Sequence, residues 1–114
     1  MKKPVSLLLI VITLLFSLTS CNAKSKLVRA WECPDSGEEI YLFEDGRGIV
    51  SYDGTDVQLS SWEVQKDVLI MNSDDSYYYF EPTKFKVTKN TLTLTKSNGR
   101  EIIYRRMTNS KYDF

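Results

Sequence analysis

The stretch KFKVTKNTLTLTKSNGREIIYRR, residues 84–106, decides the fold class of this chain. Apolar and polar residues alternate within it, and this period of two places the apolar side chains on one face of a β-sheet. Lys89-Asn90 and Ser97–Gly99 interrupt the alternation with residue types that favour tight turns. We therefore expect three antiparallel strands joined by two hairpins. The predicted inward residues are Phe85, Val87, Leu92 and Leu94, and Thr91, Thr93 and Thr95 face outward.

The same pattern of short apolar segments and turns continues back to Leu27. Asp-Gly pairs at 45–46 and 53–54 mark hairpins, and no segment after residue 26 has a sustained helical period. Short strands at even spacing are typical of sandwiches and barrels, and closure removes exposed edges. We expect an all-β domain over 27–107, a small antiparallel up-and-down barrel of about eight strands, with a C-terminal tail over 108–114. The candidate strands are 27–33, 38–44, 48–52, 56–64, 68–71, 77–81, 84–88, 91–96 and 100–107.

The first 20 residues have the three-part pattern of a secretory signal peptide. Lys2 and Lys3 precede an uncharged apolar run over 5–18, and small residues follow it. The run is shorter than the roughly 20 residues that span a bilayer. We therefore predict an N-terminal signal helix over 1–20 rather than a permanent transmembrane helix.

The sequence LTSC at residues 18–21 resembles the lipobox of bacterial lipoproteins. In that family the cysteine becomes the first residue of the mature chain and carries a diacylglycerol. The resemblance implies a lipidated Cys21 and a short tether over 21–26, with acyl chains that hold the domain on a membrane. Asn22 stands where many inner-membrane lipoproteins have Asp, which favours the outer membrane and a domain facing the periplasm. An ordinary signal peptide with an incidental cysteine is the alternative.

Charge and composition narrow the function classes. The chain has 15 basic and 15 acidic residues, and removal of Lys2 and Lys3 leaves 13 basic against 15 acidic. No basic patch is long enough to predict nucleic-acid binding. The 94 residues from Cys21 onward suit one domain with a small core.

Few residues with catalytic or metal-binding chemistry are present. The chain has no histidine, so it has neither a histidine-based triad nor an imidazole metal ligand. Neighbouring residues of a strand point to opposite faces, which separates Glu38 from Glu39. Asp74 and Asp75, with Asn72, lack the ligand spacing of a calcium loop and read as a solvated turn. We expect no enzyme activity, no cofactor and no metal.

Once Cys21 is lipidated, Cys33 has no disulfide partner. Unpaired cysteine is among the most buried residue types, so buried packing is the favoured interpretation and a free thiol is the other.

Aromatic residues are the remaining functional clue. Tyr77–Phe80 places four rings in succession, and further rings stand at Trp31, Trp62, Tyr41 and Phe43. Core packing with large side chains on the outer sheet is one interpretation. The other is a ring-lined cavity or a surface for a partner.

Several motifs of residues 27–106 resemble the small lipocalin-like lipoproteins of gram-negative bacteria. They are LVRAW, IYLFEDGRG, SSWEV followed by VLIM, and the stretch over residues 86–106. Leu27 and Trp31 match the family's first-strand motif, although Arg29 stands where that motif has Gly. The resemblance implies a barrel that is able to hold a small apolar molecule. In lipocalins a basic residue of the last strand packs over the first-strand Trp, which implies a barrel-closing pair of Trp31 with Arg105, or with Arg106.

Residues 31–59 also resemble the opening of the membrane-bound inhibitors of C-type lysozyme, which are small lipoproteins with an eight-stranded barrel. The shared features are an aromatic-x-Cys motif, a turn, alternating strands and a Gly turn. The departures are an unpaired Cys33 and the absence of the Ser-Gly-x-x-Tyr loop that enters the lysozyme cleft.

The sequence leads to one expected function and two alternatives. We expect a lipid-anchored envelope lipoprotein that binds a small apolar or amphipathic molecule without catalysis, through residues that the sequence does not identify. The alternatives are a protein inhibitor of an envelope-attacking enzyme such as lysozyme, with NSDDSYYY at 72–79 as its contact loop, and a structural envelope subunit.

Overall fold

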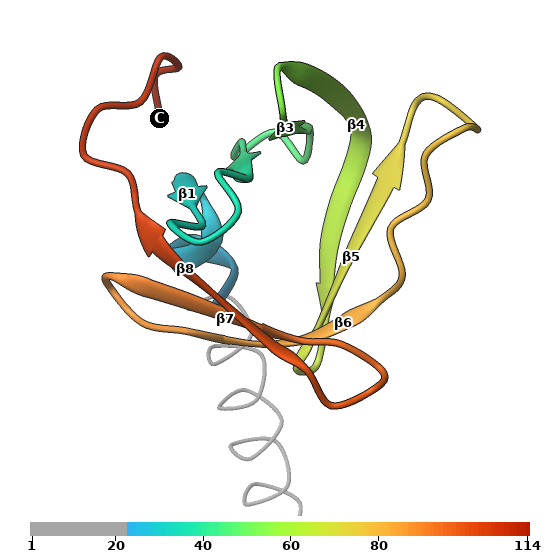
Figure 1. The fold of residues 1–114 in the computed structure, drawn as a ribbon, viewed down its shortest axis with the longest axis vertical. Coiled ribbons are helices and arrows are strands. Elements are labelled where there is room, and N and C mark those ends of the chain that lie inside the picture. The colour runs from blue at the N-terminus through green and yellow to red at the C-terminus, as the bar shows by residue number, and fades with distance from the viewer. Residues whose placement is uncertain (1–22) are drawn as a thin grey trace, which may run out of the picture.

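The computed structural model of the chain describes residues 23–114, and these form an eight-stranded antiparallel barrel (Figure 1). The predicted signal helix over 1–20 and Cys21 lie outside the described residues. The strands are β1 (Ala30–Glu32), β2 (Glu39–Leu42), β3 (Gly48–Tyr52), β4 (Thr55–Gln65), β5 (Val68–Ser73), β6 (Thr83–Val87), β7 (Thr91–Thr95) and β8 (Glu101–Arg106).

Each strand pairs with its neighbour in the sequence, and β1 pairs with β8 to close the barrel. In the closing pair Trp31 lies opposite Arg106, and Glu32 lies opposite Arg105. The expected all-β class and up-and-down barrel are therefore confirmed. Since every strand has two neighbours, closure satisfies the backbone groups that an edge strand would expose.

The tight turns follow the local sequence. Asp53 and Gly54 connect β3 to β4 with φ angles of 51° and 80°. Positive φ at both positions of a two-residue connection is the hairpin geometry whose twist matches that of paired strands. Lys66 and Asp67 form another two-residue link, between β4 and β5, in which Lys66 has a φ of 56°.

The alternation in residues 84–95 is confirmed. Phe85, Leu92 and Leu94 are buried, and Val87 packs against the same core cluster. Thr91, Thr93 and Thr95 alternate with the buried leucines and are exposed or partly exposed.

The predicted strand over 77–81 is wrong, because these residues belong to a loop over 74–82. Within this loop the amide of Tyr78 donates to the carbonyl of Asp75 at 3.1 Å, and the amide of Tyr77 donates to the Asp75 carboxylate at 2.9 Å. These turn hydrogen bonds take up backbone groups that a strand would need for its ladder, so the strand propensity of the consecutive tyrosines is not realised.

One side of the barrel opens where this loop crosses. Strands β5 and β6 share only two register pairs, Val68 with Lys84 and Leu69 with Thr83. The remainder of β5 pairs with β4 alone, so β5 and β6 diverge toward the loop over 74–82 (Figure 1).

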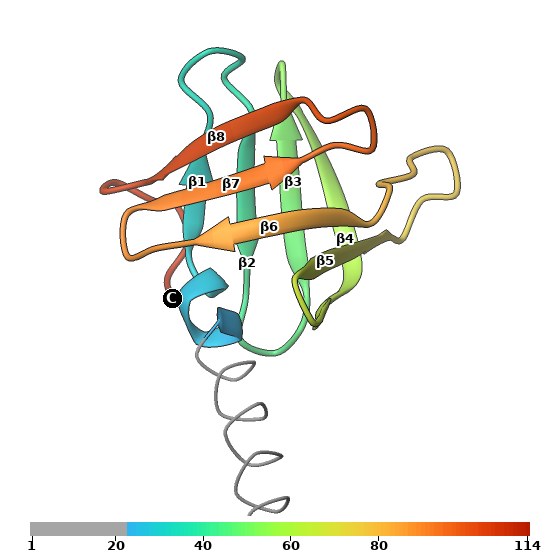
Figure 2. The same ribbon diagram turned by 90° about the horizontal axis from the view of Figure 1, so that it is seen from below.

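A short helix over residues 23–27 covers one end of the barrel, beside the β2–β3 connection (Figure 2). Leu27 is fully buried, and Ala23 packs against the core. Ala23 belongs to the stretch expected to be a tether and Leu27 to the expected strand over 27–33, but both lie in this helix, because their apolar side chains cover the end of the core.

The C-terminal tail over 108–114 lies on the outer face of the first strands. The Tyr112 ring lies 4.9 Å from that of Tyr41 and 5.7 Å from that of Phe43, measured between centroids. The Phe114 ring stacks on Phe43 at 5.3 Å. These contacts hold the tail against β2 and the connection that follows it.

Candidate binding site at the open end of the barrel

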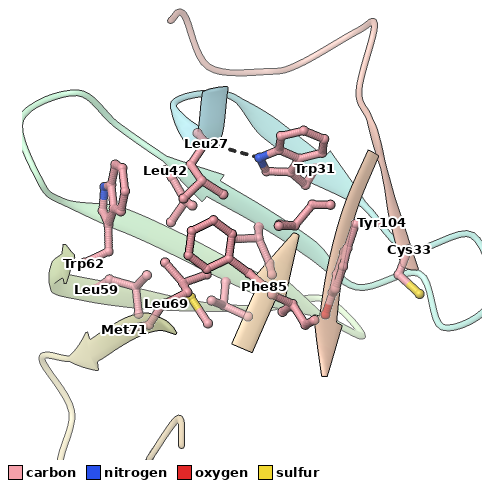
Figure 3. Close-up of a cluster of buried hydrophobic side chains, with 14 residues drawn as sticks. Leu27, Trp31, Cys33, Leu42, Leu59, Trp62, Leu69, Met71, Phe85 and Tyr104 are labelled. Carbon is pink, nitrogen blue, oxygen red and sulfur yellow. Dashed lines mark hydrogen bonds between the residues drawn. The ribbon is translucent and has the colours of Figure 1, made fainter. Parts of the chain in front are cut away.

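Side chains fill the interior of the barrel, so it is not an empty calyx (Figure 3). Two tryptophans, Trp31 and Trp62, lie in the same buried cluster as Phe85 and Tyr104. The indole Nε1 of Trp31 donates to the carbonyl of Leu27 at 3.2 Å, which ties the core to the N-terminal helix (Figure 3). The closed end is therefore sealed by packed side chains, and a ligand needs a site nearer the other end.

That other end carries a solvent-open pocket of about 500 Å³, within the range of small-molecule sites. Its apolar wall comes from Val50 of β3, Val57 of β4 and Phe80 of the loop. Residues Glu38, Tyr52, Asp53, Thr55 and Tyr78 complete the lining. This set, the open-end pocket, contains two carboxylic acids and no basic residue.

Glu38 connects the pocket to the core. Its Oε2 accepts a hydrogen bond from the Tyr104 hydroxyl at 3.1 Å, across 66 positions of sequence. Burial, and then the neighbouring Glu38, raise the pKa of Tyr104. The hydroxyl therefore stays protonated and donates to the carboxylate. One Glu38 oxygen is held by the core, and the residue also lines the pocket.

Glu39 lies on the other side of the sheet, as predicted from the alternation of strand residues. Its neighbour is the outward-facing Tyr41, whose pKa is raised by burial and then by a hydrogen bond with Glu39. The two adjacent glutamates therefore do not share a site.

The loop over 74–82 adds exposed rings beside the pocket. Tyr77 and Tyr79 are 86% and 81% exposed, whereas Tyr78 is 40% exposed and lines the pocket. Tyr77 and Tyr78 contact edge to face at 5.6 Å. Two large rings, Tyr77 and Tyr79, thus remain mostly exposed to solvent, a feature typical of contact surfaces.

Asn72, at the end of β5, and Asp75 of this loop are engaged in local hydrogen bonds. The amide of Asn72 donates to the Ser61 hydroxyl at 3.0 Å, and the carboxylate of Asp75 accepts from the amide of Tyr77. Within residues 23–114 no three acidic, cysteine or histidine side chains gather in a way that holds a metal ion.

A second hollow, of about 520 Å³, lies under the C-terminal tail. Phe43, Ile49, Tyr112 and Phe114 are among its lining residues. The C-terminal tail already occupies one side of this hollow through Tyr112, Asp113 and Phe114, whereas no tail residue lines the open-end pocket. We therefore place the candidate site at the open end.

The expected barrel-closing pair of Trp31 and Arg105 is arranged differently. Arg105 Nε donates to Glu32 Oε1 at 2.8 Å on the exposed side of the barrel. The cation over Trp31 is Arg29, whose Cζ lies 5.7 Å from the ring centroid. Arg106, the other candidate, is the register partner of Trp31. In a strand only alternate residues face the same side, so Arg106 shares a face with Trp31 and Arg105 does not.

Cys33 is 4% exposed and lies in the main core cluster. Its predicted role as a small buried residue is confirmed. The sequence did not point to Glu38 with Tyr104, or to Arg29 over Trp31. The first pair depends on long-range register, while the position of Arg29 two residues before Trp31 was a local signal for the second.

Comparison with protein-family models, curated proteins and solved structures finds no significant match to the chain. Over residues 23–114 the structure contains no helix with the length and apolar character needed to cross a membrane.

Proposed function

We propose that this chain is a lipid-anchored envelope lipoprotein whose non-catalytic, lipocalin-like barrel binds a small amphipathic molecule at its open end. The acylated Cys21 attaches it to the outer membrane, with the barrel in the periplasm. The observation that carries the binding proposal is the open-end pocket, in which an apolar wall faces carboxylic acids and tyrosines.

The lining defines the ligand's chemistry. Val50, Val57 and Phe80 suit an apolar body, because its contact with them removes apolar surface from water. Glu38 and Asp53 accept hydrogen bonds or attract positive charge, and the ring of Tyr52 offers a face to a cation. The ligand is therefore an apolar molecule with a cationic or hydrogen-bond-donating head. Since the interior is packed, it is held at the mouth and not enclosed.

Native mass spectrometry of the full chain, purified from its own envelope, tests this proposal. We expect a bound mass of a few hundred daltons. Glu38→Gln should lower its occupancy at least about tenfold, because a hydrogen bond to a charged group contributes about 1.5–3 kcal/mol. Glu63→Gln, an exposed change on the outside of β4, is the matched control. A chain without bound mass, or equal occupancy in both variants, would contradict the proposal.

A second candidate function is inhibition of an envelope-attacking enzyme such as lysozyme, and the exposed Tyr77 and Tyr79 favour it. Tyrosines contribute strongly to protein interfaces. The double change Tyr77→Ser and Tyr79→Ser should abolish capture of lysozymes while leaving the ligand at Glu38 in place. A structural envelope subunit remains the third proposal, and the same double variant should then lose an envelope protein from pull-downs instead.

A further inference from the structure

The closed end of the barrel carries a group of basic residues that the proposed pocket does not use. Arg29 precedes β1, Lys89 lies in the β6–β7 connection and Arg106 ends β8. We call these three residues the basic cluster. Two backbone contacts gather them: Arg29 Nη1 donates to the carbonyl of Lys89 at 2.9 Å, and the amide of Arg106 donates to the carbonyl of Asn90 at 2.9 Å.

The charge of the basic cluster is not neutralised within residues 23–114. The ion pairs in this part of the chain join Arg47 to Asp45, Arg105 to Glu32 and Lys111 to Asp56. The Nε of Arg29 is buried and has no hydrogen-bond partner. Burial, and then the charge of Arg106, lower the pKa of Arg29. An anion between these groups would relieve the repulsion, because arginine binds phosphate with charge-assisted hydrogen bonds.

A hollow of about 460 Å³ is present beside the basic cluster, lined by Asn90, Arg105, Arg106, Met107 and Thr108. The side-chain amide of Asn90 and the hydroxyl of Thr108 are neutral donors that suit phosphate oxygens. Arg106 belongs both to the hollow and to the cluster, so a phosphate there would meet its guanidinium directly.

The position of this end, close to the proposed anchor at Cys21, indicates that the phosphate belongs to a membrane lipid. Ala23, the first described residue, packs on the core at this end and lies two residues after Cys21. Two extended residues reach at most about 7 Å, which is less than the roughly 8 Å over which charges act at physiological salt. The short helix also presents Lys24 and Lys26 to solvent. An acylated Cys21 therefore brings this end against lipid headgroups.

One segment from each end of the barrel differs in charge in the way such an orientation requires, and beside the first segment the β2–β3 connection adds Glu44 and an Asp45 paired with Arg47. Residues 23–29 contain three basic and no acidic residues, whereas the loop over 74–82 contains three acidic and no basic residues. Anionic lipids attract the first end and repel the second.

We propose that the basic cluster of Arg29, Lys89 and Arg106 binds the phosphate of an anionic membrane lipid headgroup and fixes the barrel with its open end away from the bilayer. The orientation rests on the proposed lipid anchor at Cys21. The phosphate site itself rests on the geometry of the cluster and its hollow.

Thermal unfolding of the full chain in a non-ionic detergent tests the site. The probes are dispersed short-chain phosphatidylglycerol, phosphatidylcholine of the same chain length, and inorganic phosphate. A ligand that binds only the folded state at tenfold above its Kd should raise the unfolding midpoint by roughly 6–10 °C in a domain of this size. We expect this rise with phosphatidylglycerol, and less than half of it with the other two probes.

Two charge-matched double variants assign the effect to residues. Lys89→Ala with Arg106→Ala removes one lysine and one arginine from the cluster, and should lose at least half of the rise. Lys96→Ala with Arg100→Ala removes the same residue types from the β7–β8 connection and should keep it. The single change Lys89→Glu, at an exposed position, repeats the test if the double variant folds poorly.

Equal losses in the two double variants would overturn the site, because they would show a response to net charge alone. An equal rise with inorganic phosphate would overturn the headgroup assignment and indicate a free-phosphate site. An equal rise with phosphatidylcholine would also overturn it. The titration needs neither acylation nor the open-end ligand. Failure of the anchor, read from Cys21→Ala, or of the pocket, read from Glu38→Gln, is therefore distinguishable from failure of this site.

Discussion

Replacing Leu27 by alanine tests whether the N-terminal helix is part of the folded domain or only a connection to the membrane. Leu27 is fully buried in the main core cluster, and its carbonyl accepts the hydrogen bond of the Trp31 indole. Shortening the side chain removes three carbon atoms from beneath this end of the barrel and leaves the backbone contact in place.

The expected loss of stability follows from the burial of Leu27. Three carbons at about 0.8 kcal/mol each contribute about 2.4 kcal/mol of transfer free energy. The cavity that remains adds to this, since the ring of Trp31 is held by its hydrogen bond and cannot collapse freely, which gives a total of about 3–5 kcal/mol. At 4–8 °C per kcal/mol, the unfolding midpoint should fall by at least about 12 °C.

Urea unfolding followed by tryptophan fluorescence measures this change. Lys26→Ala is the control, because Lys26 is exposed in the same helix and its loss should alter the free energy of unfolding by less than about 0.5 kcal/mol. The slope of free energy against urea should be the same in all three proteins. If Leu27→Ala unfolds with the wild-type midpoint, the helix does not cap the core.

Three further predictions concern the barrel itself. Gly48→Ala should lower the free energy of unfolding in urea by about 1–3 kcal/mol, since a Cβ there would lie 2.5 Å from the backbone oxygen of Tyr41. An unchanged free energy of unfolding would contradict the close approach of β2 and β3. Cys33→Ser should cost more stability than Cys33→Ala, because a hydroxyl replaces the thiol at a 4% exposed core position, and equal thermal midpoints would count against that burial. Raised pKa values of Tyr41 and Tyr104 mean that the unfolded state releases these protons first above pH of about 10, so stability is retained below that pH and falls above it. Between pH 8 and 12 the urea midpoint of Tyr104→Phe should fall less steeply with pH than that of the wild type. An equally steep fall in both proteins would refute the contribution of Tyr104.

Local residue order determined the strands and most of their connections. Alternation in residues 84–95 set the inward faces of β6 and β7, because the strand period of two sorts neighbours onto opposite sides whatever the partner strand. Asp53-Gly54 determined a hairpin through backbone conformation alone. Burial of Cys33 followed from its residue type and its lack of a partner.

Tertiary structure decided what the residues of the two ends do. The ring-rich stretch 77–81 has strong strand propensity, yet it lies in a loop whose first amides bond to Asp75 and not to a neighbouring strand. The hydrogen bond between Tyr104 and Glu38 depends on the register of strands distant in sequence, which local patterns do not encode. Likewise Arg105 pairs with Glu32 while Arg106 shares the face of Trp31, since the β1–β8 register assigns each residue a partner only when the barrel closes.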